Sequence, residues 1–283
     1  MSTHLRCASA IMRLFKRRFN QNYDPIKARK TLVRAKLIAT VQTVAEFGIE
    51  ARGTGRTEDS ILYVPGNGFV LGVDDSHRRL IDRLCDRTGA QGYLLHYRLA
   101  PEFPFPAAHQ DTINAIEYVR ARTSGRLWVV ADSAGGALAL SAIVARRADS
   151  RQPDRVVLLS PLTDLAMTGL SHVYNRYHEP MFGPEALIHK GHHYLQGAAP
   201  TDPRASPLWG DLAGIPPLLA VVGDREVMLE DSTRLVTKVN QSGGDATAVV
   251  CHGAPHAFPL TLPRAPESKR AVDTIVSFLT ADR

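Results

Sequence analysis

From residue 59 to the end of the chain, short apolar runs alternate with longer stretches whose apolar residues recur at helical spacing. Each run is dominated by Val, Leu and Ile, which predicts a buried β-strand. The runs are ILYV (61–64), GYLLHY (92–97), RLWVVA (126–131), RVVLLS (155–160), PPLLAVVG (216–223) and TAVVC (247–251). The stretches that predict helices lie at 76–89, 107–122 and 132–147, and near 230–242 and 266–281. Strands separated by helices predict an α/β fold with a mostly parallel, doubly wound sheet that helices cover on both faces.

Two segments do not follow this alternation. Residues 165–205 are rich in His, Tyr, Gly and Pro and lie between two predicted strands. Near the N-terminus, Ile11, Phe15 and Phe19 recur at every fourth position, which predicts an amphipathic helix with these side chains on its apolar face.

The N-terminal segment also carries most of the positive charge. Asp24-Pro25 predicts the start of a second helix, over about 25–47, because Pro suits the first helical position and Asp accepts the free N–H groups. Residues 1–36 hold ten Lys or Arg and one acid, so the remainder has a net charge of −3 although the chain is +6. Such a segment either binds an anionic membrane surface or nucleic acid, or forms solvated helices over the protein body. Interleaved aromatic stacking residues and phosphate-binding loops are missing, so we favour the second interpretation and expect no nucleic-acid partner.

Composition narrows the class of protein. The 283 residues are 44% hydrophobic and 22% charged, which is typical of a globular chain with a sizeable core. No apolar run approaches the roughly 18 residues of a membrane span, and the N-terminus lacks the apolar region of a signal peptide, so we expect a mature chain without an integral membrane segment. Cys7, Cys85 and Cys251 are odd in number and far apart, which favours reduced thiols in the cytoplasm over disulfides or a zinc site.

The sequence VVADSAGGALA contains the strongest chemical signal. It places Ser133 between an apolar strand and a helix, with Ala131 and Gly135 two positions to either side. Small residues at these positions permit the tight strand-to-helix turn of a nucleophile elbow, a G-x-S-x-G pattern with Ala at the first Gly. The alternative is that Ser133 only caps the helix, but the preceding strand and the run DSAGG favour a nucleophile.

A serine nucleophile needs a base and an acid, which should follow it in the chain. His256, in CHGAPHAF after the last strand, is the candidate base, and His252 is the alternative. Asp224 and Glu226 follow PPLLAVVG, and either carboxylate is able to orient the imidazole.

Six stretches together resemble one known family. They are GFVLG, YRLAPEFPFPAA, DSAGG, SPLTDL, SPLWGDLAGIPPLL and GAPHAF. In content and order they are similar to the hormone-sensitive-lipase-like esterases, the bacterial family IV carboxylesterases, over about residues 60–260. The resemblance implies an α/β-hydrolase fold, with no metal or cofactor. In the family, the triad acid is the first residue of a D-P-L-x-D-E type stretch. Here EVMLED lies at the same distance before the following helix. This implies Glu226 as the triad acid, with Asp224 as the alternative.

The same resemblance assigns a role to the loop after the first predicted strand of the hydrolase region. Where the family carries H-G-G-G, this chain has Pro65, Gly66, Asn67 and Gly68. The family loop donates two backbone N–H groups to the oxyanion, which implies Asn67 and Gly68 here, and the residue after the nucleophile, Ala134, supplies a third. Asn tolerates the left-handed conformation and keeps its N–H, whereas Pro65 lacks the side-chain hydrogen bonds of the family His. The oxyanion hole formed by these N–H groups is therefore kept, slightly displaced or lost. The Asn67 side chain is expected either to add a hydrogen-bond donor to this hole or to fill it.

Three further features have simpler interpretations. Arg98 and Glu102 are expected to form a structural ion pair, and HKGHH (189–193) is expected to hold ordinary histidines because its spacing is poor for a metal. The inner face of the 165–205 segment is expected to be lined by four aromatic residues: Tyr174, Tyr177, Phe182 and Tyr194.

These features together predict one α/β-hydrolase domain, residues 1–283, with a cap formed by 1–50 and 165–205. The expected reaction is hydrolysis of a short- or medium-chain carboxylic ester or a lactone through an acyl-enzyme on Ser133. Its partner is that small molecule, and the oligomeric state, a homodimer included, is left open. The alternative is a specialised biosynthetic enzyme (a cyclase, lactone-opening enzyme or eliminase) or a low-activity binding protein on the same scaffold.

Overall fold

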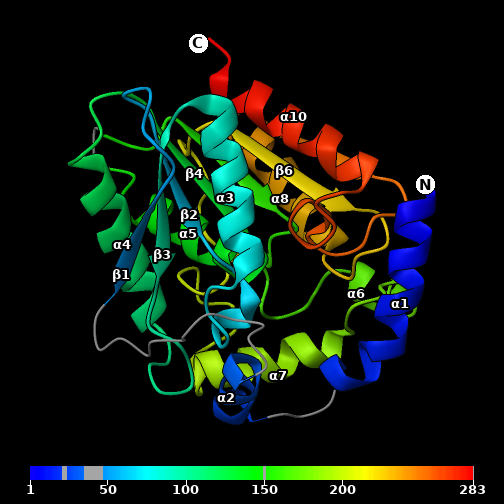
Figure 1. The fold of residues 1–283 in the computed structure, drawn as a ribbon. Helices are drawn as coiled ribbons and strands as arrows, with labels where there is room; N and C mark the ends of the chain where they lie inside the picture. The colour runs from blue at the N-terminus through cyan, green and yellow to red at the C-terminus, as the bar shows by residue number, and fades with distance from the viewer. Residues whose placement is uncertain (21–23, 35–46, 149–150, 283) are drawn as a thin grey trace.

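The computed structural model describes residues 1–20, 24–34, 47–148 and 151–282 (Figure 1). Their strands form one sheet in the order β1-β3-β2-β4-β5-β6-β7. The strands are β1 (Gly48–Arg52), β2 (Ser60–Val64), β3 (Gln91–His96), β4 (Leu127–Asp132), β5 (Arg155–Leu159), β6 (Leu218–Gly223) and β7 (Ala246–Cys251). β1 is antiparallel to β3, and the other neighbouring strands are parallel. The predicted fold class and all six predicted strands are confirmed.

Helices cover both faces of this sheet (Figure 1). The helices of the described residues are α1 (Thr3–Asn20), α2 (Pro25–Arg34), α3 (Asp75–Thr88), α4 (Ala107–Arg120), α5 (Ala134–Ala145), α6 (Ser171–Tyr174), α7 (Pro184–Leu195), α8 (Leu229–Gln241), α9 (Phe258–Thr261) and α10 (Pro266–Thr280). Two short 3-10 turns, η1 (Asn67–Phe69) and η2 (Pro207–Trp209), complete the elements. No helix among the described residues is both long and apolar enough to cross a bilayer.

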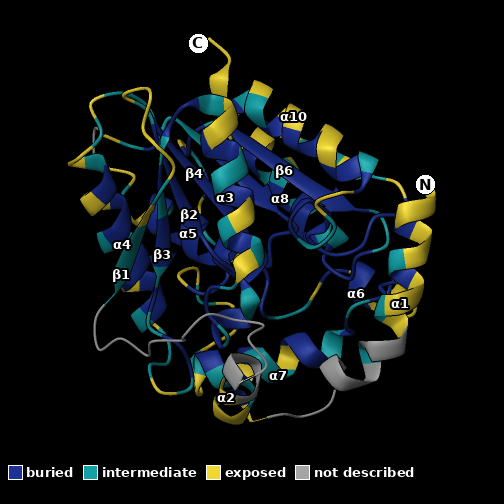
Figure 2. Cartoon of the chain, viewed as in Figure 1, coloured by how far each residue is buried: buried dark blue, intermediate teal, exposed yellow. Residues whose placement is uncertain are grey.

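The two faces of the sheet build two separate apolar cores. On β2, Ile61 and Tyr63 join the core beneath α3 and α10, whereas Leu62 and Val64 join the core beneath α4, α5 and α8. This alternation follows from the two-residue period of a strand. Because both faces are covered, β2, β4 and β6 are buried along their whole length (Figure 2). The loops that follow β4 and β6 therefore start from fully buried strands.

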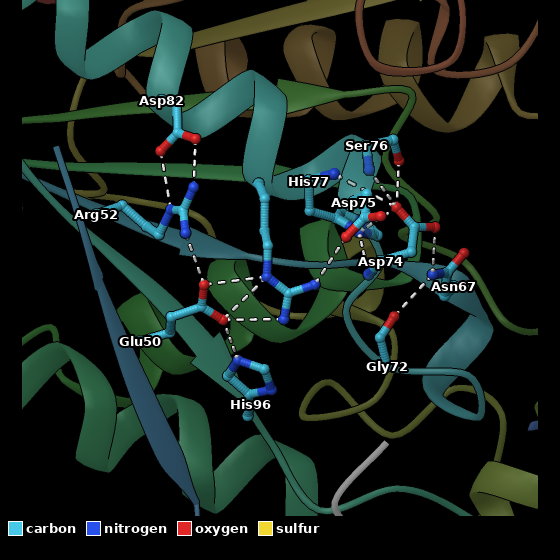
Figure 3. A network of polar contacts seen from close by, with 11 residues as sticks. Glu50, Arg52, Asn67, Gly72, Asp74, Asp75, Ser76, His77, Asp82 and His96 are labelled. Atoms are coloured by element: carbon cyan, nitrogen blue, oxygen red, sulfur yellow. Dashed lines mark hydrogen bonds and ion pairs between the residues drawn. The ribbon is translucent and has the colours of Figure 1, made fainter. Parts of the chain in front are cut away.

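The edge strand β1 has no counterpart among the predicted strands. Glu50 accepts hydrogen bonds from Arg78 on α3, with Nη2 and Oε2 3.0 Å apart, and its Oε2 lies 3.0 Å from His96 Nε2 on β3 (Figure 3). Burial opposes the charge of Glu50, but Arg78 and His96 outweigh it and lower the pKa of Glu50 to about 2. Charges supplied by other elements thus hold a strand whose own sequence has only weak apolar alternation.

The second N-terminal helix starts as predicted. Asp24 Oδ1 accepts hydrogen bonds from the N–H groups of Ile26 (2.9 Å) and Lys27 (3.2 Å), so Asp24 caps α2. The helix ends at Arg34, and the rest of the predicted span, residues 35–46, lies outside the described residues. Residues 48–50, which were expected to belong to the cap, form the start of β1 instead.

Helix α1 is amphipathic, but its buried face differs from the prediction. Leu5 and Ser9 are buried, while Ile11 is 58% exposed; the Phe15 and Phe19 side chains lie outside the described residues. The helix is tied to the body near both ends: Ser2 donates from its backbone N to Glu267 Oε1 (2.8 Å), and Lys16 donates to two carbonyl groups of residues 176–179. Its position beside the 165–205 segment (Figure 1) agrees with solvated helices that cover the body.

Candidate active site

Ser133 occupies the turn between β4 and α5. Its backbone is in a left-handed conformation, with φ 50° and ψ −124°, and its side chain is nearly buried. A Cβ at Gly135 would collide with the carbonyl oxygen of Val64, which explains why the turn needs small residues. A strained turn at the carboxyl end of a central strand is the geometry expected of a nucleophile elbow. Ala134 begins α5, so its N–H has no partner within the helix.

The loops after β6 and β7 bring Glu226 and His256 together. Glu226 Oε2 lies 3.0 Å from His256 Nδ1, and both side chains are buried. The other carboxylate oxygen, Oε1, accepts hydrogen bonds from Ser160 Oγ (2.7 Å) and the N–H of Gly223 (2.6 Å). Ser160 Oγ also accepts from the N–H of Ala257 (2.9 Å). Ser160 therefore connects the acid to the histidine loop. No pattern in the sequence pointed to Ser160 as a functional residue, although it opens the SPLTDL stretch.

The alternative acid and histidine pair with each other. Asp224 Oδ2 lies 2.6 Å from His252 Nδ1, and the N–H of Gly253 donates to Asp224 Oδ1. The His252 side chain is 79% exposed, so this pair faces solvent. The structure thus joins Glu226 to His256 in the interior and Asp224 to His252 at the surface.

The loop after β2 is a left-handed turn. Asn67 and Gly68 have φ values of 56° and 65°, and Phe69 has 66°. The Asn67 side chain donates from Nδ2 to the carbonyl of Gly72 (2.7 Å) and to Asp74 Oδ2 (3.2 Å) (Figure 3). It is therefore neither a filler of the site nor an extra donor to it, contrary to both alternatives drawn from the sequence. It fastens its own loop instead.

Asp132 and Tyr97 hold the first half of this loop. The Tyr97 hydroxyl donates to the carbonyls of Pro65 (3.1 Å) and Gly66 (2.7 Å), and the N–H of Gly66 donates to Asp132 Oδ1 (3.1 Å). Asp132 also accepts from the Tyr63 hydroxyl (3.0 Å). Asp132, the residue before Ser133, thus orients the neighbouring loop. Tyr97 supplies side-chain hydrogen bonds to this loop, which Pro65 is unable to make.

His77 lies between Asp74 and Asp132, the two carboxylates that hold the loop after β2. It is fully buried, with Nδ1 3.0 Å from Asp74 Oδ1 and Nε2 3.4 Å from Asp132 Oδ1. Burial opposes its charge, but the Asp132 and Asp74 carboxylates outweigh burial and raise the pKa of His77 to about 10. The same imidazolium and the hydrogen bonds of Ser76 and Asn67 hold the pKa of Asp74 well below its usual range. His77 therefore joins the Asn67 side to the Asp132 side of the loop.

The 165–205 segment packs directly on this machinery. Phe69 stacks on Tyr194 of α7 with ring centroids 3.9 Å apart, and Phe182 contacts the His256 ring edge-to-face at 4.9 Å. Phe182 and Tyr194 are buried, as expected of inner-face residues, but Tyr174 and Tyr177 are exposed, so that part of the prediction is wrong.

Two other expectations concern charged and metal-binding groups. Arg98 pairs with Asp111 (2.7 Å), and Glu102 pairs with Arg29 of α2 (2.5 Å), so the predicted Arg98–Glu102 pair is wrong. Within the described ranges, no group of three or more His, Cys, Asp or Glu is arranged to hold a metal ion. His189 and His193 of the HKGHH stretch contact each other, with their Nε2 atoms 3.3 Å apart.

Comparison with known proteins gives a consistent result. Residues 61–260 match a family described by the α/β-hydrolase fold. An acetyl-hydrolase of Streptomyces hygroscopicus is 37% identical over 238 residues, covering 83% of this chain and 79% of the relative. An esterase of Acinetobacter venetianus is 32% identical over 248 residues, which cover 86% of this chain and 82% of that esterase.

Solved structures agree with these relatives over nearly the whole chain. The crystal structure of EstE5 soaked with p-nitrophenyl butyrate superposes with a TM-score of 0.88 at 29% identity, covering 99% of this chain and 98% of that one. An esterase from the bacterial hormone-sensitive lipase family gives 0.84 at 31% identity, with the same coverage.

Proposed function

Because this chain belongs to the hormone-sensitive-lipase-like carboxylesterases of the α/β-hydrolase fold, we propose that it hydrolyses esters through an acyl-enzyme on Ser133. That it is a carboxylic ester hydrolase follows from its relatives; the residues, the intermediate and the substrate are the proposal. The observation that carries it is the buried Glu226–His256 contact, found in the same sheet as the strained Ser133 turn after β4.

The proposed reaction has two half-reactions. His256 Nε2 accepts the Ser133 proton while Oγ attacks the ester carbonyl, and Glu226 holds Nδ1–H and stabilises the imidazolium. The tetrahedral oxyanion accepts hydrogen bonds from the N–H groups of Asn67, Gly68 and Ala134. The C–O bond of the ester then breaks, and His256 gives the proton to the departing alcohol. A water molecule, deprotonated by His256, cleaves the acyl-enzyme and releases the acid. No step requires a metal or cofactor.

The proposed substrate is a short- or medium-chain ester or a lactone. Two observations support a restricted acyl site: one relative is named an acetyl-hydrolase, and the Phe182–His256 contact places an aromatic ring of the cap against the base. We assign the cap to α1, α2 and residues 165–205. The free thiols of Cys7, Cys85 and Cys251 support a cytoplasmic enzyme.

The test is a panel of p-nitrophenyl esters from acetate to palmitate on purified protein, with Ser133→Ala as the central variant. We expect the highest kcat/KM on short acyl chains, a burst of p-nitrophenol in the parent, and a loss on the order of 10⁶ in kcat for the variant. Ser277→Ala, an exposed serine on α10, is the matched control and should match the parent. Turnover retained by correctly folded Ser133→Ala would remove Ser133 from the role.

A further inference from the structure

Lys190 is a cation that α7 places against the proposed oxyanion loop. Its stem lies on Gly68, so close that a Cβ at Gly68 would be 3.3 Å from Lys190 Cβ and 3.2 Å from Cγ, and would collide with Cδ. A side chain at position 68 would force the lysine stem to shift from where it lies. The expected N–H donor of Gly68 and the Lys190 side chain are therefore immediate neighbours.

The ammonium group lies near the aromatic ring that contacts His256. Lys190 Nζ is 6.0 Å from the centroid of the Phe182 ring, and that ring contacts His256 edge-to-face. Lys190 thus sits between the loop that would hold the oxyanion and the aromatic ring that covers the histidine.

No carboxylate of the described residues forms an ion pair with Lys190. Burial alone lowers the pKa of Lys190, to about 8, so most molecules carry the charge at neutral pH. The nearby acids of the cap are committed elsewhere: Glu185 pairs with Arg176, while burial and the charge of Glu226 raise the pKa of Glu179 well above its usual range. A cation held without a counter-charge beside an active site is a binding group for an anion.

We propose that Lys190 binds an anionic group of the substrate, a carboxylate on either the acyl or the alcohol part, and so selects half-esters and carboxylate-bearing esters over neutral ones. This inference rests on the proposed function, because it places the ester at Ser133. In both cases a carboxylate of the substrate lies within reach of the Lys190 ammonium group. Two pairs of substrates show whether that carboxylate is on the acyl part or on the alcohol part.

The experiment compares kcat/KM within pairs of matched esters at pH 7. Monomethyl succinate against methyl butyrate places the charge on the acyl part, and 4-acetoxybenzoate against phenyl acetate places it on the alcohol part. The parent should prefer the anionic member of one pair by at least tenfold. Lys190→Met should reduce that ratio by tenfold or more, and Lys190→Arg, which keeps the charge, should retain most of it. Lys269→Met, which removes an exposed charge of α10, is the control and should leave the ratio unchanged.

Each outcome decides the inference. A parent without preference in either pair, or a Lys190→Met variant that lowers both members of a pair equally, would overturn it while ester hydrolysis stands. The preference in the parent needs no variant, so a misfolded Lys190→Met protein does not prevent the test. If the parent turned over none of the four esters nor any p-nitrophenyl ester, the proposed function itself would fail.

Discussion

Glu226 lies 3.0 Å from His256, Oε2 to Nδ1, although the two residues are 30 positions apart in the chain. Asp224, only two residues before Glu226, pairs with the exposed His252 instead. The buried pair has the geometry needed to fix one tautomer of the His256 imidazole. The surface pair is exposed to water and contributes little to orientation or stability.

This division predicts a clear difference between two acid variants. Glu226→Gln should lower kcat by about 10²–10⁴-fold, because an amide stabilises neither the required tautomer nor the imidazolium. Asp224→Asn should stay within about threefold of the parent, because its partner is exposed. Steady-state kinetics on p-nitrophenyl butyrate measure both. A crippled Asp224→Asn together with an active Glu226→Gln would transfer the triad role to Asp224.

A second prediction concerns the side chain of Asn67. Asn67→Gly keeps the backbone N–H and the positive φ but loses the hydrogen bonds to Gly72 and Asp74. The loop then gains freedom, and we expect kcat/KM to fall about three- to tenfold, or about 0.7–1.4 kcal/mol. Asn67→Asp, which sets a carboxylate against Asp74, should lose more. A glycine variant faster than the parent would show that this tie does not support the loop.

The third prediction is a pH dependence of stability due to His77. Its folded pKa of about 10 lies above the ordinary value of 6.5. The stabilisation by its charged form is therefore complete below pH 6.5 and is lost as the pH rises through about 10. The free energy of unfolding of the parent should exceed that of His77→Gln by a margin that shrinks by at least about 1 kcal/mol over this range. Urea unfolding at several pH values gives that margin. A constant margin would mean that His77 is neutral in the folded protein.

The fourth prediction concerns the attachment of α1. Lys16 Nζ donates to the carbonyls of Arg176 (2.6 Å) and Glu179 (2.7 Å), next to the segment that carries Phe182. Lys16→Met should lower Tm by about 2–4 °C, equivalent to about 1 kcal/mol, and Arg13→Met, an exposed basic residue of the same helix, should not. Deletion of residues 1–20 should lower Tm further and change the range of esters. Tight, salt-sensitive DNA binding that disappears with this deletion would contradict a covering role.

The sequence by itself determined the parallel sheet and the Ser133 turn. Both depend on local chemistry: buried strands need continuous apolar runs, and the elbow needs small residues at positions such as Gly135, which packs on the Val64 carbonyl. The order of Ser133, the acid and His256 was likewise readable, because it follows the order of the strands that end at one edge of the sheet. The edge strand β1 was not predicted from the sequence. It has no clear apolar pattern, and its Glu50 pairs with charged groups of α3 and β3.

The family resemblance implied Glu226 as the acid, and the tertiary structure shows that it meets His256 while Asp224 meets His252. Asp224 and Glu226 follow the same strand, and two residues of spacing in a loop do not tell which carboxylate turns inward. The packing of the β6 and β7 loops on Ser160 settles that contact. Lys190 is the sharper case. In the sequence it is one residue of a His-rich helix, and it becomes a candidate for substrate recognition only because α7 lies across Gly68, which has no side chain to exclude it.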